Sequence, residues 1–514
     1  MRKVTILLAA VVLSLGVGSS AQQSNPIQAA SDALGASALK SLRFSGLGAN
    51  FSVGQSPSPG APWPRVTIKS FDAAINYETA SMRVELVREQ GAIPPRGGGV
   101  PFTGEQRFIE FLNGGDAWNV ALVPPPPPPP PAPGAAPVVP PAGGRPRFNE
   151  QPPEPQFAAA AERMQQIWLT PHGFLRAATA NKATTRAVAG GTEVSFTVAG
   201  MHKFTGIINR RNQVERVQTW FASPVLGDMA AEALYSDYEQ VDGGVSFPMR
   251  ILQKQGKHPS LELWIHSVQP NAPVDIATPE TIRDAASMAR AAIRVEMQKI
   301  AEGVHYLTGG SHHSVAIEMS DHVVVVEAPL NEERSLAVIA KVNETIPNKP
   351  IRFVVNTHHH FDHAGGLKTF ADRGATIVTH EMNRAFYEKA WASTPAFQTF
   401  TDKHVLGDGV RNIEVHRIAN SPHHDGFAMV YLPVEKILIE ADAYTPPPAV
   451  SAESTTPPNP AAPPVVPAQG PPVNQTALNL YENIRRLKLD VNRIAALHGP
   501  RLATMDDLAR AAGR

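Results

Sequence analysis

Residues 357–366 read THHHFDHAGG, with four histidines and one aspartate between His358 and His363. The five residues before them, RFVVN at 352–356, predict a buried strand, and the AlaGlyGly after them allows a tight turn into a helix that begins near Leu367. The histidines are therefore expected at the carboxyl end of a strand, where α/β proteins usually place their chemistry.

The spacing of these side chains favours metal binding. Side chains two positions apart on extended backbone share a face, so His358 and His360 can bind one ion while His359 points elsewhere. Asp362 and His363 follow around the turn and offer a carboxylate and an imidazole to a second ion. Nitrogen and oxygen ligands in this combination suit zinc, and a solvated polar loop is the poorer interpretation of so dense a pattern.

In this motif the chain resembles the metallo-β-lactamase-fold hydrolase superfamily. The residues that match its HxHxDH signature are His358, His360, Asp362 and His363. The family pattern continues with a third histidine, an acidic residue at the end of the next strand (here 437–440), and a histidine near the C-terminus. The positions of this chain that match are His423, Asp442 and His498.

The resemblance implies an α+β fold class with a C-terminal αββα sandwich and two Zn²⁺ per chain. The implied ligands of the first ion are His358, His360 and His423. The implied ligands of the second ion are Asp362, His363 and His498, with Asp442 bridging the two. Three neighbours depart from the family pattern: His424 replaces a small hydroxyl residue, Leu497 a glycine and Ala441 another glycine. The choice between His423 and His424 therefore depends on the alignment.

The expected activity is hydrolysis by a hydroxide shared between the two metals, with Asp362 able to move a proton. Two Zn²⁺ against two carboxylates and one hydroxide leave a charge of about +1, which favours an anionic or carbonyl-containing small-molecule substrate. In the β-lactamases of this fold, the position that matches Asp442 is a cysteine or a serine, whereas a bridging aspartate resembles the glyoxalase II and general hydrolase branch. An ester, thioester or lactone is thus the preferred substrate class, and a β-lactam is the alternative.

Composition and the N-terminus indicate where the protein works. Its 514 residues include 46 acidic and 46 basic side chains, which gives no argument for nucleic-acid or anionic-membrane binding. Arg2 and Lys3 precede an apolar run over 4–17 that is too short to span a bilayer, and small residues follow at 19–21. We expect a signal peptide over 1–21, a periplasmic or secreted protein and no stable membrane span after cleavage. The chain has no cysteine, so disulfides and a lipid-anchored cysteine are excluded.

The rest of the chain predicts a β-rich accessory domain over 28–275. Alternating apolar residues, as in 82–86 and 194–198, indicate a long, curved antiparallel sheet with one helix near 158–168. This pattern is similar to the half-barrel of periplasmic lipoprotein carriers, so a non-enzymatic carrier of an apolar ligand is a further alternative. Proline-rich insertions occupy 124–155 and 446–472.

A connecting helix is predicted over 276–302, because Thr278 and Pro279 form a helix start and apolar residues continue at helical spacing. The metallo-β-lactamase-fold domain then covers 303–514. His312 and His313 lie in a turn that we interpret as a polar loop, and His359 is expected to bind neither ion.

Overall fold

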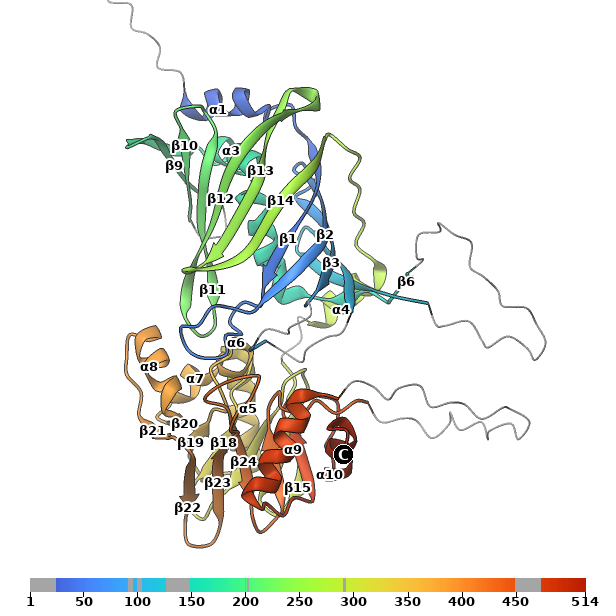
Figure 1. Ribbon diagram of the computed structural model, residues 1–514. Helices are drawn as coiled ribbons and strands as arrows, with labels where there is room; N and C mark the ends of the chain where they lie inside the picture. The colour runs from blue at the N-terminus through green and yellow to red at the C-terminus, as the bar shows by residue number, and fades with distance from the viewer. Residues whose placement is uncertain are drawn as a thin grey trace, which may run out of the picture.

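The computed structural model describes residues 25–90, 96–98, 104–125, 148–198, 200, 203–289, 293–448 and 473–514 (Figure 1). The predicted signal peptide and most of both proline-rich insertions lie outside these residues. Among the helices of the described part, none combines the length and the hydropathy needed to cross a bilayer.

The N-terminal region is one large antiparallel sheet, as the alternating pattern predicted. In the described residues it has 14 strands, in the spatial order β6-β5-β4-β3-β2-β1-β14-β13-β12-β11-β10-β9-β8, with β7 also paired to β5. The strands are β1 (Ser41–Phe51), β2 (Arg65–Asn76), β3 (Ser81–Glu89), β4 (Glu105–Asn113), β5 (Asp116–Val123), β6 (Asn149–Glu150), β7 (Glu154–Pro155), β8 (Thr184–Val188), β9 (Gly191–Thr197), β10 (Lys203–Asn209), β11 (Val214–Ser223), β12 (Gly227–Val241), β13 (Val245–Gln255) and β14 (His258–Pro270).

The sheet curves around two helices, α2 (Ala160–Leu169) and α3 (Pro171–Ala180), while α1 (Pro26–Leu34) covers one end (Figure 1). Helix α2 contacts β3, β4 and β5 as well as β11, so opposite parts of the sheet reach the same helix. The close approach of β14 to β1 requires glycine, because a Cβ on Gly48 would lie 1.9 Å from the carbonyl oxygen of Glu262. The concave face encloses a cavity of about 340 Å³ lined mainly by apolar side chains.

The predicted connecting helix over 276–302 is wrong in its second half. Helix α4 (Glu280–Ala289) ends early, and residues 296–301 form strand β15 (Glu296–Ala301). This strand pairs antiparallel with β16 (Val304–Thr308), for example Met297 with Leu307. Backbone pairing with a neighbouring strand thus overrides the helical spacing of the apolar residues.

The C-terminal region contains two further sheets. In the described residues the first has the order β15-β16-β17-β18-β19-β20-β21 and the second β22-β23-β24-β25-β26. The strands not yet given are β17 (Ser314–Glu318), β18 (Val323–Val326), β19 (Ile351–Val355), β20 (Thr376–His380), β21 (Phe397–Phe400), β22 (Lys403–Gly407), β23 (Asn412–Arg417), β24 (Ala428–Leu432), β25 (Ile437–Glu440) and β26 (Arg493–Ala496). The helices are α5 (Glu332–Thr345), α6 (Phe361–Ala364), α7 (Leu367–Ala371), α8 (Glu381–Ala390), α9 (Gln475–Leu487) and α10 (Met505–Ala511).

Three apolar clusters show that these elements form four layers. Side chains of both sheets, such as Val326 and Ile439, pack together in the cluster between them. The outer face of the first sheet packs on α5, α7 and α8, and that of the second sheet on α9 and α10. The arrangement is the predicted αββα sandwich.

The two regions meet along segments far apart in sequence. Val225, in the turn between β11 and β12, is buried in the apolar cluster that covers the first C-terminal sheet, and its carbonyl accepts a hydrogen bond from Trp391 Nε1 at 2.8 Å. The loop between β1 and β2, residues 52–64, reaches the histidine motif: its Pro57 carbonyl accepts from the Asp425 backbone N–H at 2.8 Å.

Candidate metal centre

The end of β19 and three later loops bring the sequence-predicted residues together. The motif begins after β19, as predicted, and His363 lies in the short helix α6. His423 lies between β23 and β24, and Asp442 follows β25. Asp442 has a positive φ of 61°, which costs an L residue about 1–2 kcal/mol and aims its carboxylate into the centre.

A first group that could hold a metal ion consists of His358, His360, His423 and Asp442, whose ligand atoms lie within 4.8 Å of one another. His358 Nε2 and His423 Nε2 are 3.1 Å apart. Asp442 Oδ2 lies 3.6 Å from His358 Nε2 and 3.3 Å from His423 Nε2. Ligand-type atoms of three buried histidines and of the half-buried Asp442 thus lie close together.

A second group consists of His312, Asp362 and His363. Asp362 Oδ2 lies 3.4 Å from His312 Nε2 and 3.8 Å from His363 Nε2. Asp442 Oδ2 is 2.9 Å from His363 Nε2, so this single oxygen lies between the two groups. That is the position of a ligand shared by two ions.

His498, which the resemblance implies as a ligand of the second ion, lies near these two groups but belongs to neither. Its ring centroid is 4.2 Å from that of His312 and 6.4 Å from that of His363. His312, which was interpreted as part of a polar loop, instead lies with Asp362 and His363 in the second group. The signal available for it in the sequence was the pair of adjacent histidines, His312 and His313.

Glu327 determines the orientation of His358. The hydroxyl of Thr357 donates to the Glu327 carboxylate, so it must accept a hydrogen bond from His358 Nδ1, 2.9 Å away. The Nδ1 of His358 therefore carries the proton and its Nε2 presents a lone pair to the first group. A carboxylate behind a histidine is the usual support of a metal ligand. Glu327 was not predicted as a site residue, although an acidic residue directly after the all-valine strand β18 was a signal.

The N-terminal region orients His360. His360 Nε2 lies 2.8 Å from the backbone carbonyl oxygen of Ser56, which can only accept, so Nε2 carries the proton. The Nδ1 of His360 is then free to bind a metal. Gln55, the residue before Ser56, donates from its side-chain amide to Asp362 Oδ1 at 2.7 Å. No local pattern in the sequence could have predicted these contacts, because about 300 residues separate the partners.

His359 and His424 form a separate hydrogen-bonded pair. The backbone N–H of Gly426 donates to His424 Nδ1 at 3.0 Å, so His424 Nε2 is protonated and donates to His359 Nδ1 at 2.6 Å. His359 Nε2 then donates to the hydroxyl of Ser56 at 3.1 Å. Neither histidine keeps a lone pair for a metal. This geometry favours His423 over His424 as the ligand.

Burial and charge set the protonation states of the centre. Burial, together with the charge of His363, lowers the pKa of His358 to about 3, and burial holds the pKa of His360 well below its usual value. Although burial opposes it, His363 lowers the pKa of Asp442. Burial also raises the pKa of Glu440 to about 8; its Oε2 accepts the N–H groups of the turn that carries the aspartate.

The donor set fits metal ions. Among the described side chains, His360 Nδ1 and both ring nitrogens of His363 are buried without a hydrogen-bond partner. Buried polar atoms are normally satisfied, and the ring nitrogens of His363 lie beside the carboxylates of Asp442, Asp362 and Glu327, so this donor set suits a cation. Neutral imidazoles and carboxylates are the ligands that zinc prefers. The residues present therefore suit the two-ion site that the motif implies.

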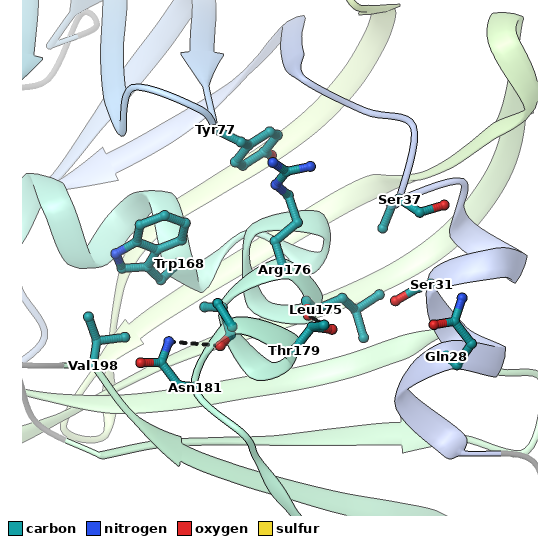
Figure 2. A pocket seen from close by; sticks show the side chains of 13 residues that line it. Gln28, Ser31, Ser37, Tyr77, Trp168, Leu175, Arg176, Thr179, Asn181 and Val198 are labelled. Carbon is teal, nitrogen blue, oxygen red and sulfur yellow. Dashed lines mark hydrogen bonds between the residues drawn. The ribbon is translucent and has the colours of Figure 1, made fainter.

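A different cavity, at the end of the N-terminal region covered by α1 and α3, is unrelated to this chemistry. It has a volume of about 460 Å³, and Figure 2 shows Tyr77, Trp168 and Arg176 around it. Its described lining residues include neither a histidine nor a carboxylate.

Comparisons with known proteins agree with the geometry. Residues 307–491 match the model of the metallo-beta-lactamase superfamily. The C-terminal domain therefore has the fold of that superfamily, which confirms the resemblance drawn from the histidine motif.

Individual relatives are distant. The chain is 26% identical over 139 residues to the 2,4-dinitroanisole O-demethylase subunit alpha of Nocardioides sp. (strain JS1661), a match that covers 26% of this chain and 42% of that protein. A metallo-beta-lactamase from Pontibacter korlensis is 19% identical and one from Hirschia baltica 20%; each match covers 43% of this chain, with 98% and 96% of the other chain, at a TM-score of 0.33.

Proposed function

We propose that this protein is an exported hydrolase that uses two zinc ions to cleave an ester, thioester or lactone. The observation that carries the proposal is the position of Asp442 Oδ2, 2.9 Å from His363 Nε2 and 3.3 Å from His423 Nε2, between two groups of ligand-type side chains. Export to the periplasm or the medium is supported by the sequence pattern of residues 1–21.

The residues of the chain supply orientation and proton transfer. Zinc, when bound, lowers the pKa of a water molecule from far above the neutral range to about 7 and so supplies a nucleophile near neutral pH. Thr357 and the Ser56 carbonyl hold His358 and His360 in the tautomers that can bind it. Although burial opposes it, the charge of His363 lowers the pKa of Asp362, so this carboxylate is ionised at neutral pH and can accept a proton from water.

Several substrates fit a site of this kind. An aspartate at the bridging position favours an ester, thioester or lactone over a β-lactam. The curated relative adds an aryl ether to the bonds worth testing, since its name describes an O-demethylase that acts on 2,4-dinitroanisole. We expect the substrate to be a small molecule, anionic or carbonyl-containing, because the site carries a net positive charge once loaded.

A second candidate function, a carrier of an apolar ligand, is favoured by one observation. The concave face of the N-terminal sheet encloses about 340 Å³ lined by side chains such as Phe44, Phe71 and Phe247. A carrier would release a co-purified apolar ligand on denaturation and would show no turnover.

The test is to produce the chain without residues 1–21, count its metal ions by mass spectrometry, and assay six chromogenic substrates in parallel. These are an ester, a thioester, a lactone, a phosphodiester, a β-lactam and 2,4-dinitroanisole. We expect about two zinc ions per chain and turnover that chelation and Asp442→Ala both abolish. Fewer than one metal ion per chain together with no turnover would contradict the proposal.

A further inference from the structure

A cavity of about 600 Å³ lies between the N-terminal region and the C-terminal domain. Cavities of this size at the meeting of two domains are typical of small-molecule sites. One wall is formed by the loop 52–64 and by the strands near Met229, and the other by helix α8 and Phe361. Its apolar lining includes three aromatic rings, those of Trp63, Phe361 and Phe386.

The lysines and the absence of carboxylates give the described lining of this cavity charges of one sign. Lys257 lines the cavity from the turn between β13 and β14, and Lys389 lines it from α8. Each of the two regions therefore supplies one ammonium group. Among the described residues that line the cavity there is no aspartate or glutamate. Neither lysine has an ion-pair partner in the described part of the chain. An apolar space with two unpaired cations at its edge is complementary to an organic anion.

A hydrogen-bond donor lies beside the same space. The chain of bonds from Gly426 through His424 and His359 ends on the hydroxyl oxygen of Ser56. Since this oxygen accepts from His359, the hydroxyl proton of Ser56 is left to donate to another acceptor. Ser56 and His359 both line the cavity, and Ser56 is only 4% exposed. A buried donor of this kind requires a partner oxygen.

We propose that the interdomain cavity is a binding site for a small aromatic anion, such as an aromatic carboxylate or sulfonate. The rings of Trp63, Phe361 and Phe386 contact its aromatic body. Lys257 and Lys389 attract its acidic group, and the hydroxyl of Ser56 donates to one of its oxygens. This site differs from the metal centre in its ligand and its residues, although Ser56 takes part in both, because its carbonyl accepts from His360.

The probe for the test is 8-anilinonaphthalene-1-sulfonate, an aromatic sulfonate whose fluorescence rises in apolar sites. The full chain without residues 1–21 is titrated with it, and the Kd is compared with that of the double variant Lys257→Glu, Lys389→Glu. We expect the double variant to bind about tenfold more weakly, because two attractions become repulsions. The matched control is Lys182→Glu, Lys488→Glu, which changes the net charge equally at two exposed lysines outside the cavity lining.

A second variant separates this cavity from the apolar space inside the N-terminal sheet. Ala385 lines the interdomain cavity and is exposed, so Ala385→Trp narrows the cavity without disturbing the core. It should abolish saturable binding of the probe while the thermal melting curve stays unchanged. Equal probe affinity in the wild type, the lysine double variant and Ala385→Trp would overturn the proposal, since the probe would then bind elsewhere.

Two further measurements make the proposal specific. Naphthoate should displace the probe more strongly than decanoate, which carries the same charge on an aliphatic body; the reverse order would overturn the aromatic preference. The titration is repeated after chelation of all metal. Lysine-dependent binding that survives chelation supports the site whether or not the protein proves to be a hydrolase.

Discussion

Two sets of histidines lie side by side in this protein, equally buried but used differently. In the pair His359 and His424, every ring nitrogen has a hydrogen-bond partner. In the neighbouring set, His360 Nδ1 and both nitrogens of His363 make no hydrogen bond with the described residues. All four rings are at most 2% exposed. Burial therefore does not distinguish a metal ligand from a structural histidine; in these two sets the difference is that His363 leaves ring nitrogens without a hydrogen-bond partner among the described residues, beside the carboxylates of Asp362 and Asp442.

The largest effect is expected from a comparison of two adjacent residues. His423→Ala removes a side chain of the first ligand group, so zinc content should fall and turnover should decrease on the order of a thousandfold, because a metal contributes several kcal/mol to the reaction. His424→Ala should leave the zinc content intact and lower the free energy of unfolding by about 1–3 kcal/mol, since His359 loses its donor. Zinc counts and urea unfolding of both variants measure this.

If His424→Ala lost zinc and His423→Ala kept it, the distinction between the two sets would be wrong. The conservative variant His424→Gln serves as a control. Its amide can still donate to His359 Nδ1, so part of the lost stability should return.

A smaller effect is expected from the loop that holds His360. Gly54 has a φ of +75°, and a Cβ there would lie 2.4 Å from the ring of Phe361. Gly54→Ala should therefore displace the loop and withdraw the Ser56 carbonyl and the Gln55 amide from the motif. Losing such supporting contacts typically weakens metal binding 10–100-fold, which a chelator competition titration can measure.

Gly60→Ala is the matched control for this displacement. Gly60 lies in the same loop with a φ of +85°, but a Cβ there meets no atom within 4 Å. Both variants carry the cost of a positive φ, and only one collides with Phe361. Equal zinc affinities of the two variants would show that the loop does not position the metal ligands.

The smallest effect concerns His172, a histidine buried in the N-terminal region beside Phe247. Burial lowers its pKa to about 4, whereas the unfolded chain has the ordinary value of about 6.5. Between these two pKa values the unfolded state binds a proton on His172 and the folded state does not. The free energy of unfolding is therefore highest above pH 6.5 and falls as the pH decreases toward 4. The loss from pH 7 to pH 5 should be about 2 kcal/mol.

The measurement compares the urea unfolding of the wild type and of His172→Gln at pH 7 and pH 5. Glutamine does not titrate but can still donate to the Leu34 carbonyl, which His172 Nε2 contacts at 3.0 Å. Between pH 7 and pH 5 the free energy of unfolding of the variant should fall by about 2 kcal/mol less than that of the wild type. An identical loss in both proteins would mean that His172 is protonated in the folded state, and that burial without a metal does not keep a histidine neutral here.

The sequence predicted those parts of the fold and site that depend on local spacing. The alternation of apolar residues predicted the antiparallel N-terminal sheet, and the motif at 358–363 predicted a cluster at the end of β19. Three distant residues, His423, Asp442 and His498, were found because they match a family pattern, and the first two lie in the first ligand group.

Features that depend on pairing between distant segments could not be predicted in this way. Residues 296–301 have helical spacing, but hydrogen bonds to β16 make them a strand. His312 was dismissed because its turn is polar, and only the fold brings it to Asp362. The contacts of Gln55 and Ser56 with the motif join residues whose separation in sequence leaves no periodic trace.

The atom of Ser56 that accepts from His360 belongs to the main chain. A substitution at position 56 leaves this backbone carbonyl in the chain. An insertion or deletion between 52 and 64 would instead displace it from His360. Ordinary surface loops tolerate insertions well. In this loop we expect the contact with His360 to survive a change of side chain at position 56 and to be lost when the length of the loop changes. A chimera that joins this C-terminal domain to another N-terminal module would have to include a loop long enough to bring a backbone carbonyl to His360.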